Sequence, residues 1–169
     1  METYHSRKKV FLWNTSIETM INQPNWIEML SKVIHSFLTR NDCILLWRPH
    51  PLLLSSIRSM RTNYEKPYLN LIKTASSLDN VIIDHENDVY TAMRESDALI
   101  SDYSSIMIQY SITGKPILCL TGTSQMRESK CNLFDYWSNY FLNDGVSVDI
   151  FCDMVLQGKD PKNRNVSSQ

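Results

Sequence analysis

The chain has 169 residues, 43% of them hydrophobic, and its 17 Lys and Arg residues nearly balance its 18 Asp and Glu residues. This length suits one globular domain with a sizeable core and leaves no room for two complete enzyme domains. A formal net charge of -1 excludes a general nucleic-acid binder, which needs a basic surplus to replace the counterions on phosphates.

Five short apolar runs predict buried strands, because each is rich in aliphatic or aromatic residues and each ends in a polar or proline-containing loop. The first run ends at Trp13 and the second at Trp47, so core packing is the expected role of both indoles. The predicted strands are residues 9–13, 43–47, 81–83, 98–100 and 116–120.

Between these runs, apolar residues recur every three to four positions, which predicts helices. The clearest helix extends from residue 26 to residue 40, and Asn25 with Glu28 resembles a capping box at its start. Asp88 has the position of a helix cap, and Gly114 has that of a helix C-terminus. The other predicted helices are residues 55–76 with an interruption near Pro67, residues 89–93, residues 106–113 and residues 150–157.

Strand and helix alternate five times, and the strands are too apolar to face water. This pattern predicts an α/β fold with a doubly wound parallel sheet and helices on both faces. We expect a single Rossmann-like domain over residues 1–169. Its expected parts are an α/β core at 8–124, a C-terminal extension at 125–157 with an aromatic cluster at 134–141 and a turn at 143–145, and a polar tail at 158–169.

The four cysteines show neither CxxC nor metal-ligand spacing, so we expect buried, reduced thiols in a cytoplasmic protein. The longest apolar stretches are about five residues, which excludes a membrane span or signal peptide and predicts a soluble chain. No carboxylate cluster, Walker pattern or GxGxxG is present, so we expect neither a metal nor a cofactor. The cysteines are Cys43, Cys119, Cys131 and Cys152.

The segments that follow the strands are the candidate site, because ligands of a parallel sheet bind outside the carboxyl ends of its strands. Lys115 precedes the fifth strand, so we expect it at the opposite edge and exclude it from the site. The candidate segments are residues 14–18, 48–51, 84–86, 102–105 and 121–124.

One candidate segment, Asp102-Tyr-Ser-Ser105, brings two hydroxyls and several backbone N–H groups to the start of a helix. This geometry binds phosphate. Serine is also a frequent helix cap, and capping alone is the other explanation of Ser104 or Ser105. The local sequence leaves both interpretations open.

A second segment, Arg48-Pro-His50-Pro51, holds a cation and an imidazole between prolines at a strand end. An edge that carries this turn and the Ser-Ser helix start is what a diphosphate needs. A structural turn with a solvated Arg and His is the alternative. The other histidines have no such context, and we expect His5, His35 and His85 to be solvated.

Three motifs, Arg48-Pro-His-Pro51, Ser101-Asp-Tyr-Ser-Ser105 and Gly114-Lys-Pro-Ile117, together resemble the C-terminal half of the CDP-glycerol glycerophosphotransferases, the teichoic-acid primases and polymerases. The resemblance extends over residues 9–120, with the motifs in the same order. It implies a GT-B-type transferase whose Rossmann-like C-terminal domain holds the nucleotide donor while an N-terminal domain binds the acceptor. Members transfer glycerol phosphate from CDP-glycerol to an acceptor hydroxyl at the membrane surface and release CMP.

The resemblance also implies roles for individual residues. His50 is the expected catalytic residue and, with Arg48, contacts the diphosphate. Ser104 and Ser105 receive the diphosphate at the helix start, and Asp84 lies near the cytosine or the ribose. The remaining substrate-binding residues that it implies are Ser16, Asp102 and Tyr103.

The chain departs from the family pattern after its first strand, where members usually carry Pro-Thr-Trp-Arg and this chain carries Thr15-Ser-Ile-Glu18. Ser16 can stand for the Thr, but Glu18 replaces the Arg, and a negative group near a diphosphate weakens its binding. Two alternatives therefore stay open. One is a GT-B glycosyltransferase domain that uses a sugar nucleotide such as a UDP-sugar, and the other is a non-catalytic interaction module.

On the leading interpretation the chain is the donor-binding half of a glycerophosphotransferase for cell-surface polymer synthesis. We expect this half to be inactive alone, because this sequence lacks the N-terminal acceptor domain. Its expected partners are a CDP-linked donor nucleotide and that acceptor domain. We expect a cytoplasmic location and, for the full-length protein, peripheral association with the inner face of the membrane through the acceptor domain.

Overall fold

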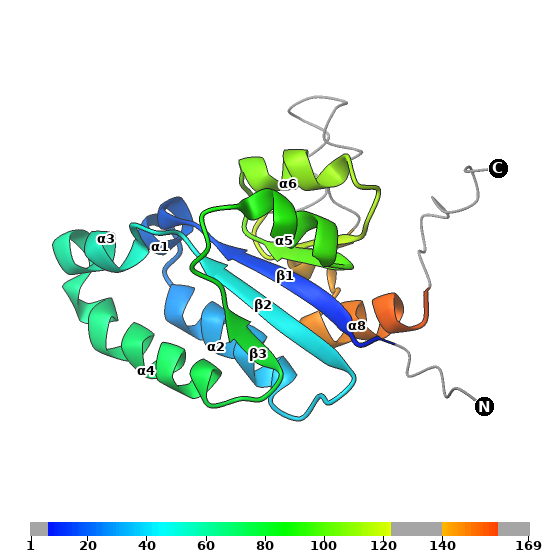
Figure 1. Cartoon of the computed structure of the whole chain (residues 1–169). Helices are drawn as coiled ribbons and strands as arrows, with labels where there is room; N and C mark the ends of the chain where they lie inside the picture. The colour runs from blue at the N-terminus through cyan, green and yellow to red at the C-terminus, as the bar shows by residue number, and fades with distance from the viewer. Residues whose placement is uncertain (1–6, 123–139, 159–169) are drawn as a thin grey trace.

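The computed structural model describes residues 7–122 and 140–158, which form one sheet between two layers of helices (Figure 1). All neighbouring strands pair in parallel, in the order β3-β2-β1-β4-β5-β6. The predicted doubly wound parallel sheet is confirmed, and its topological switch point lies between β1 and β4. The strands are β1 (Lys9–Thr15), β2 (Cys43–Pro49), β3 (Val81–Ile83), β4 (Ala98–Ser101), β5 (Ile117–Cys119) and β6 (Tyr140–Phe141).

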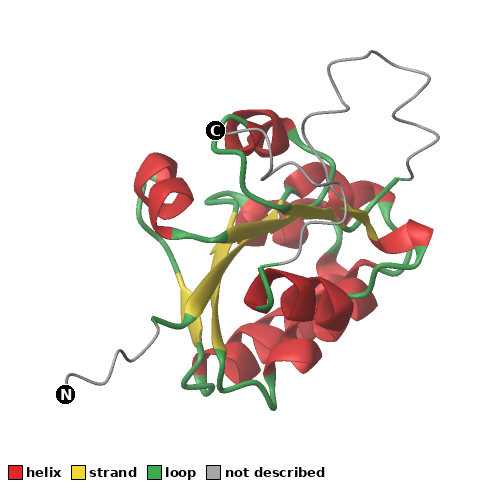
Figure 2. Cartoon of the chain, turned by 90° about the vertical axis from the view of Figure 1, so that its right-hand side faces the viewer, coloured by secondary structure: helices red, strands yellow, loops and turns green. Residues whose placement is uncertain are grey.

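Helices cover both faces of the sheet, as the turned view shows (Figure 2). Two of them, α5 and α6, lie over one face, and α2 and α8 lie over the other (Figure 1). The α-helices are α1 (Ile17–Asn22), α2 (Trp26–Phe37), α3 (Leu53–Met60), α4 (Glu65–Ser76), α5 (Val89–Glu95), α6 (Ser105–Ser111) and α8 (Val148–Leu156), and the 3-10 helices are η1 (Thr62–Tyr64) and η3 (Leu142–Asp144).

Alternating side chains of β1 separate two hydrophobic cores. Phe11 and Trp13 belong to the larger core, with side chains of α2, α4 and α8, whereas Leu12 belongs to the smaller core beneath α5 and α6. Trp13 pairs in register with Trp47 of β2, and their rings stack with centroids 4.5 Å apart. Both indoles are fully buried, so their predicted packing role is confirmed.

The structure corrects three details of the predicted elements. Helix α1 follows β1 where the sequence predicts a loop, and Ser16 caps it by accepting from the Thr19 N–H at 3.3 Å. Asn25 makes no side-chain capping bond, so the predicted capping box with Glu28 is wrong. The break between α3 and α4 lies at η1 and not at Pro67, because proline is tolerated in the first turn of a helix.

The C-terminal segment adds a sixth strand that the sequence does not predict, because two residues cannot display a periodicity. Tyr140 and Phe141 are buried and pair with β5. The chain then turns at Gly145, whose φ of 91° suits glycine, and Ser147 caps α8. The predicted turn and final helix are therefore present, and residues 134–139 of the predicted aromatic cluster lie outside the described residues.

Other local predictions are confirmed. Asp88 Oδ1 accepts from the Tyr90 N–H at 2.9 Å at the start of α5. Three cysteines are buried and free, and Cys131 lies outside the described residues. Within residues 7–122 and 140–158, every helix is too short or too polar to span a membrane.

Candidate functional site

The segments that follow the first five strands lie at one edge of the sheet, here called the carboxyl edge. Backbone hydrogen bonds join neighbouring segments, since the His50 N–H donates to Thr15 O at 3.2 Å and the Leu120 N–H donates to Ser101 O at 2.9 Å. The predicted site residues therefore share this edge. In the order of their strands across the sheet they are Asp84, then Arg48 and His50, then Ser16, then Asp102, Tyr103, Ser104 and Ser105.

Arg48 forms an ion pair with Asp84 at this edge. Its Nη1 lies 2.6 Å from Asp84 Oδ2, both side chains are 13% exposed, and its Nη2 donates to the Glu86 carbonyl at 2.7 Å. The second oxygen of Asp84 accepts from the Glu86 N–H at 2.8 Å. Arg48 thus fixes the segment after β3 against β2, and its fork geometry leaves further N–H groups for a ligand.

His50 is exposed and has a fixed orientation. Its Nδ1 accepts from the Leu52 N–H at 3.1 Å. This hydrogen bond assigns the proton of the neutral imidazole to Nε2, which has no partner among the described residues. The turn that the two prolines predict therefore holds a hydrogen-bond donor at the carboxyl edge.

Asp102 is fully buried, and it turns its carboxylate toward the segment after β1. Its Oδ2 accepts from the Ser16 N–H at 2.9 Å and lies 3.1 Å from Ser16 Oγ. Among the described residues, Oδ1 has no hydrogen-bond partner. Burial raises the pKa of Asp102 to about 6, although the bonds from Ser16 and Thr19 favour the charged form.

The backbone after β4 is also held from its other side. The Tyr103 N–H donates to Thr121 Oγ1 at 2.9 Å, and Ser101 Oγ donates to the Asp102 carbonyl at 2.7 Å. Ser104 is the N-cap of α6, but its side chain makes no capping bond and its Oγ lies 3.4 Å from Ser101 Oγ. The capping interpretation of Ser104 is therefore wrong.

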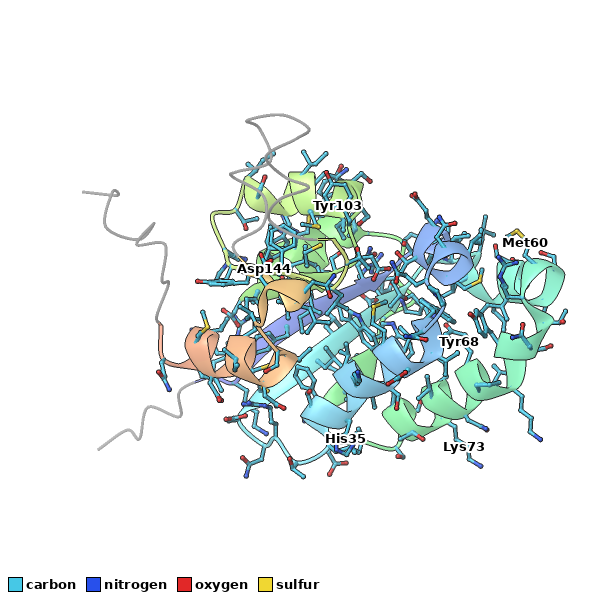
Figure 3. The ribbon with its side chains drawn as sticks, turned by 180° about the vertical axis from the view of Figure 1, so that it is seen from behind. His35, Met60, Tyr68, Lys73, Tyr103 and Asp144 are labelled. Carbon is cyan, nitrogen blue, oxygen red and sulfur yellow. The ribbon has the colours of Figure 1, made fainter. Side chains whose placement is uncertain are left out.

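Two further residues of this segment are accessible. Ser105 is exposed in the first turn of α6, and Tyr103 is 38% exposed beside that helix (Figure 3). The segment therefore presents an exposed hydroxyl and the first backbone groups of a helix at the carboxyl edge, which are groups that can bind phosphate.

Glu18, which stands where the family usually has Arg, is exposed in the first turn of α1. An acidic residue there stabilises the helix because its charge complements the positive end of the helix dipole. Glu18 thus stabilises α1 in a way that does not depend on a ligand.

A cavity of about 690 Å³ opens beside the end of β3. Its apolar wall comes from Leu46, Ile82 and Ala92, and its polar wall comes from the segment that holds Asp84. Such a volume suits a small organic ligand with one apolar face. The lining residues are Leu46, Ile82, Ile83, Asp84, His85, Glu86, Asp88, Thr91, Ala92 and Glu95.

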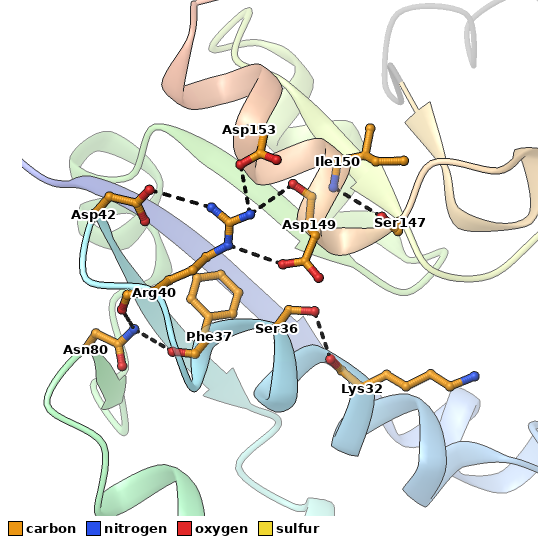
Figure 4. Close-up of polar contacts among 10 residues, drawn as sticks. All are labelled: Lys32, Ser36, Phe37, Arg40, Asp42, Asn80, Ser147, Asp149, Ile150 and Asp153. Atoms are coloured by element: carbon orange, nitrogen blue, oxygen red, sulfur yellow. Dashed lines mark hydrogen bonds and ion pairs between the residues drawn. The ribbon is translucent and has the colours of Figure 1, made fainter.

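At the opposite edge of the sheet, here called the amino edge, Lys115 and Arg40 are used in structural bonds. Lys115 Nζ donates to the carbonyls of Met93, Arg94 and Ser96, which end α5, at 2.9, 3.0 and 2.6 Å. Its predicted place away from the site is confirmed. Arg40 likewise pairs with Asp149 and Asp153 of α8 (Figure 4).

The sequence did not indicate Thr19 as part of the site, and it indicated Thr121 only as a member of a candidate segment, without a role. Thr19 lies in α1, which is too short for a periodic signal, and Thr121 follows β5 among other small polar residues. His35 and His85 are exposed as predicted, and His5 lies outside the described residues. No group of three or more His, Cys, Asp or Glu residues within the described ranges could hold a metal ion.

A doubly wound parallel sheet whose polar residues gather at its carboxyl edge defines a Rossmann-like domain. The family follows from a direct match. The model of the family described as CDP-Glycerol:Poly(glycerophosphate) glycerophosphotransferase matches residues 25–141. Because this match covers more than half of the chain, the chain belongs to that family, and the resemblance of its motifs is confirmed.

Solved structures were compared with the chain as well. An alanine variant of the wall teichoic acid polymerase TagF is 20% identical, with a TM-score of 0.51 over 93% of this chain and 37% of that chain. This likeness shows a common fold. A TagF variant soaked with CDPG gives 22% identity, a TM-score of 0.47 and coverages of 93% and 35%.

A putative UDP-N-acetylglucosamine 2-epimerase from Listeria monocytogenes is 15% identical, with a TM-score of 0.48 and coverages of 73% of this chain and 30% of that chain. The chain thus spans about a third of the length of these solved proteins. A comparison with curated proteins found no match.

Proposed function

We propose that the chain is the donor-binding half of a glycerophosphotransferase, which transfers polyol phosphate from a CDP-linked donor to an acceptor hydroxyl in cell-surface polymer synthesis. The observation that carries the proposal is the fixed, exposed Nε2 donor of His50 beside the partly used guanidinium of Arg48. Family membership supports the identity of the donor. This half is inactive alone, and the full-length protein works at the inner face of the membrane through its acceptor domain.

The reaction places negative charge where these donors point. The acceptor oxygen attacks the distal phosphorus, the bond from that phosphorus to the bridging oxygen breaks, and CMP leaves with the bonding electrons. His50 Nε2–H and the free N–H groups of Arg48 stabilise the charge on the bridging and leaving oxygens. The acceptor hydroxyl gives its proton to a base of the acceptor domain.

The diphosphate lies between the segments after β2 and β4. Ser105 and the backbone at Ser104 receive its second phosphate at the start of α6, and Tyr103 borders it. Ser16 and Asp102 line the switch point beneath it. The nucleoside extends toward Asp84 and occupies the cavity beside β3, where the apolar wall packs against the cytosine and carboxylates accept from ribose hydroxyls.

A thermal-shift titration tests this proposal. At a concentration of CDP-glycerol 100 times its Kd, the melting temperature of the wild-type chain should rise by about 5 °C or more. His50→Ala should abolish the shift, whereas His35→Ala, which removes an exposed histidine from α2, should leave it unchanged. No shift at millimolar CDP-glycerol would contradict the proposal.

The same titration separates the two alternatives. A larger shift with UDP or a UDP-sugar than with CDP-glycerol would indicate a glycosyltransferase domain. The absence of a shift with every nucleotide would indicate an interaction module. An assay of CMP release tests whether this half is inactive alone, since the chain by itself should release no CMP from CDP-glycerol.

A further inference from the structure

Three neighbouring segments of the carboxyl edge are joined through one short stretch of backbone. The carboxylate of Asp102 accepts from Ser16 after β1, and the next residue, Tyr103, donates its N–H to Thr121 after β5. The stretch after β4 is therefore fixed from both sides. Ser104 and Ser105 follow it directly, so their position depends on these bonds.

Burial of the Asp102 carboxylate costs folding free energy. The carboxylate is fully buried, and its Oδ1 has no hydrogen-bond partner among the described residues. Ser16, the N-cap of α1, and Thr19 of α1 face the carboxylate from one side. Cys119 of β5 faces it from the other side, and the Cys119 thiol stays neutral because burial raises its pKa to about 12. No cation of the described residues balances the charge, and a buried charge without a partner destabilises a fold.

A direct contact between Asp102 and a donor does not fit this geometry. The side chain is shielded from solvent, and the oxygen that has partners is already occupied by Ser16. A buried group that destabilises the fold is often found at a functional site, where the cost is tolerated because the group serves the site. The role of Asp102 must therefore be transmitted through the residues that it holds.

We infer that Asp102 is a positioning residue, whose carboxylate fixes the start of α1 against the segment after β4 and so orients Ser104 and Ser105 toward the diphosphate. It acts through Ser16 and not by contact with the donor. The inference rests on the proposed function for its ligand. The hydrogen bonds between Asp102 and Ser16 are present in the ligand-free chain.

Hydrogen exchange of the ligand-free chain tests the connection between Asp102 and Ser16 without any ligand. In Asp102→Ala, the backbone amides of residues 103–106 should exchange about tenfold faster, because the stretch is released on one side. Asp102→Asn keeps an acceptor for the Ser16 N–H and should stay near the wild-type rate. Unchanged exchange at residues 103–106 in Asp102→Ala would overturn the inference.

The chain offers a matched control at the amino edge. Asp97 Oδ2 also accepts a backbone N–H from a neighbouring strand, that of Val10, at 2.8 Å. Asp97→Ala should accelerate exchange at Val10 and leave residues 103–106 unchanged. Faster exchange of the amide of Leu12, which lies in the core, would indicate general unfolding of a variant. The exchange rates of residues 103–106 in Asp102→Asn would then test whether Asp102 holds this stretch.

A double-mutant cycle on CDP-glycerol affinity tests how Asp102 acts. Asp102→Ala should weaken binding about tenfold, and Ser16→Ala about threefold. The double variant should bind no more weakly than Asp102→Ala, because the Ser16 hydroxyl acts on the segment after β4 only through the Asp102 carboxylate. Additive losses would show a direct contact with the donor and overturn the inference. If the wild-type chain does not bind CDP-glycerol, the proposed function fails, and hydrogen exchange still decides the role of Asp102.

Discussion

The two edges of the sheet use their polar side chains in different ways. At the amino edge, Lys115 donates to three carbonyls and Arg40 pairs with two carboxylates of α8. At the carboxyl edge, His50 keeps a free donor and Arg48 keeps part of its guanidinium, while Asp102 is buried without a counterion among the described residues. The first edge uses its side chains for stability, whereas the second keeps free hydrogen-bond donors and an unbalanced buried charge, as we expect of the proposed ligand site.

The largest expected effect is at Arg48. Arg48→Met leaves Asp84 without its cation in a largely buried position, and it should lower the free energy of unfolding by about 3 to 4 kcal/mol in a urea titration. CDP-glycerol binding should weaken at the same time. This result would show that the carboxyl edge combines a structural and a ligand role in one residue.

The matched control is Arg58→Met, which breaks an ion pair with Glu65 of similar length, 2.7 Å, whose partners are 56% and 38% exposed. Exposed pairs contribute little, so this change should cost less than about 1 kcal/mol. Equal losses in the two variants would contradict the importance of burial at Arg48.

The next effect concerns the pH dependence of stability. The folded pKa of Asp102, about 6, lies above the ordinary value of 3.8, so its contribution to stability is complete below pH 3.8 and is lost as the pH rises through 6. The difference in unfolding free energy between the wild type and Asp102→Asn should therefore change by up to about 3 kcal/mol between pH 3.5 and pH 7.

Urea titrations of both proteins at each pH measure this difference. The wild type should lose stability relative to the variant as the pH rises. A difference that does not vary with pH would mean that Asp102 titrates alike in the folded and unfolded chain.

At the amino edge, Lys115→Met should cost about 2 kcal/mol, because three carbonyls at the end of α5 lose a charged donor. CDP-glycerol affinity should not change, since the residue lies at the other edge of the sheet. Lys66→Met, at an exposed position of α4, is the control and should cost less than about 0.5 kcal/mol. Loss of affinity in Lys115→Met would remove the distinction between the edges.

The smallest effect is expected at Glu18. Glu18→Arg should lower stability by about 0.5 kcal/mol, since it puts a cation at the positive end of α1, and should raise CDP-glycerol affinity about threefold by removing a negative charge near the diphosphate. Glu28→Arg makes the same change in the first turn of α2 and should leave affinity unchanged. A fall in affinity in Glu18→Arg would contradict the proposed position of the diphosphate.

Most of the sheet could be predicted, because burial on both faces makes its strands uniformly apolar. The run Val81–Ile83 is β3 without a shift at either end. Helix α1 could not be predicted, since six residues hold too few turns for a period to emerge. The capping box failed for a geometric reason, because Asn25 has φ -105° and ψ 32°, outside the extended conformation that a capping side chain needs.

The candidate site was predictable to the level of topology. The order of elements places Arg48, His50 and Ser104 at one edge and Lys115 at the other without any coordinates. The pairings within the edge were not predictable, because Arg48 and Asp84 lie 36 positions apart and Ser16 and Asp102 lie 86 positions apart. Such contacts depend on strand order and side-chain direction together, and no local pattern in the sequence records either.

The stacked tryptophans give the carboxyl edge an optical signal. Trp13 and Trp47 lie nearly face to face at 24°, and Trp47 Nε1 donates to Thr15 Oγ1 at 3.2 Å, one residue before Ser16. Two indoles this close couple electronically, so circular dichroism should contain an exciton pair from this sheet. Because Thr15 links Trp47 to the start of α1, binding of the proposed donor at the carboxyl edge should change the tryptophan fluorescence of the chain without any added label.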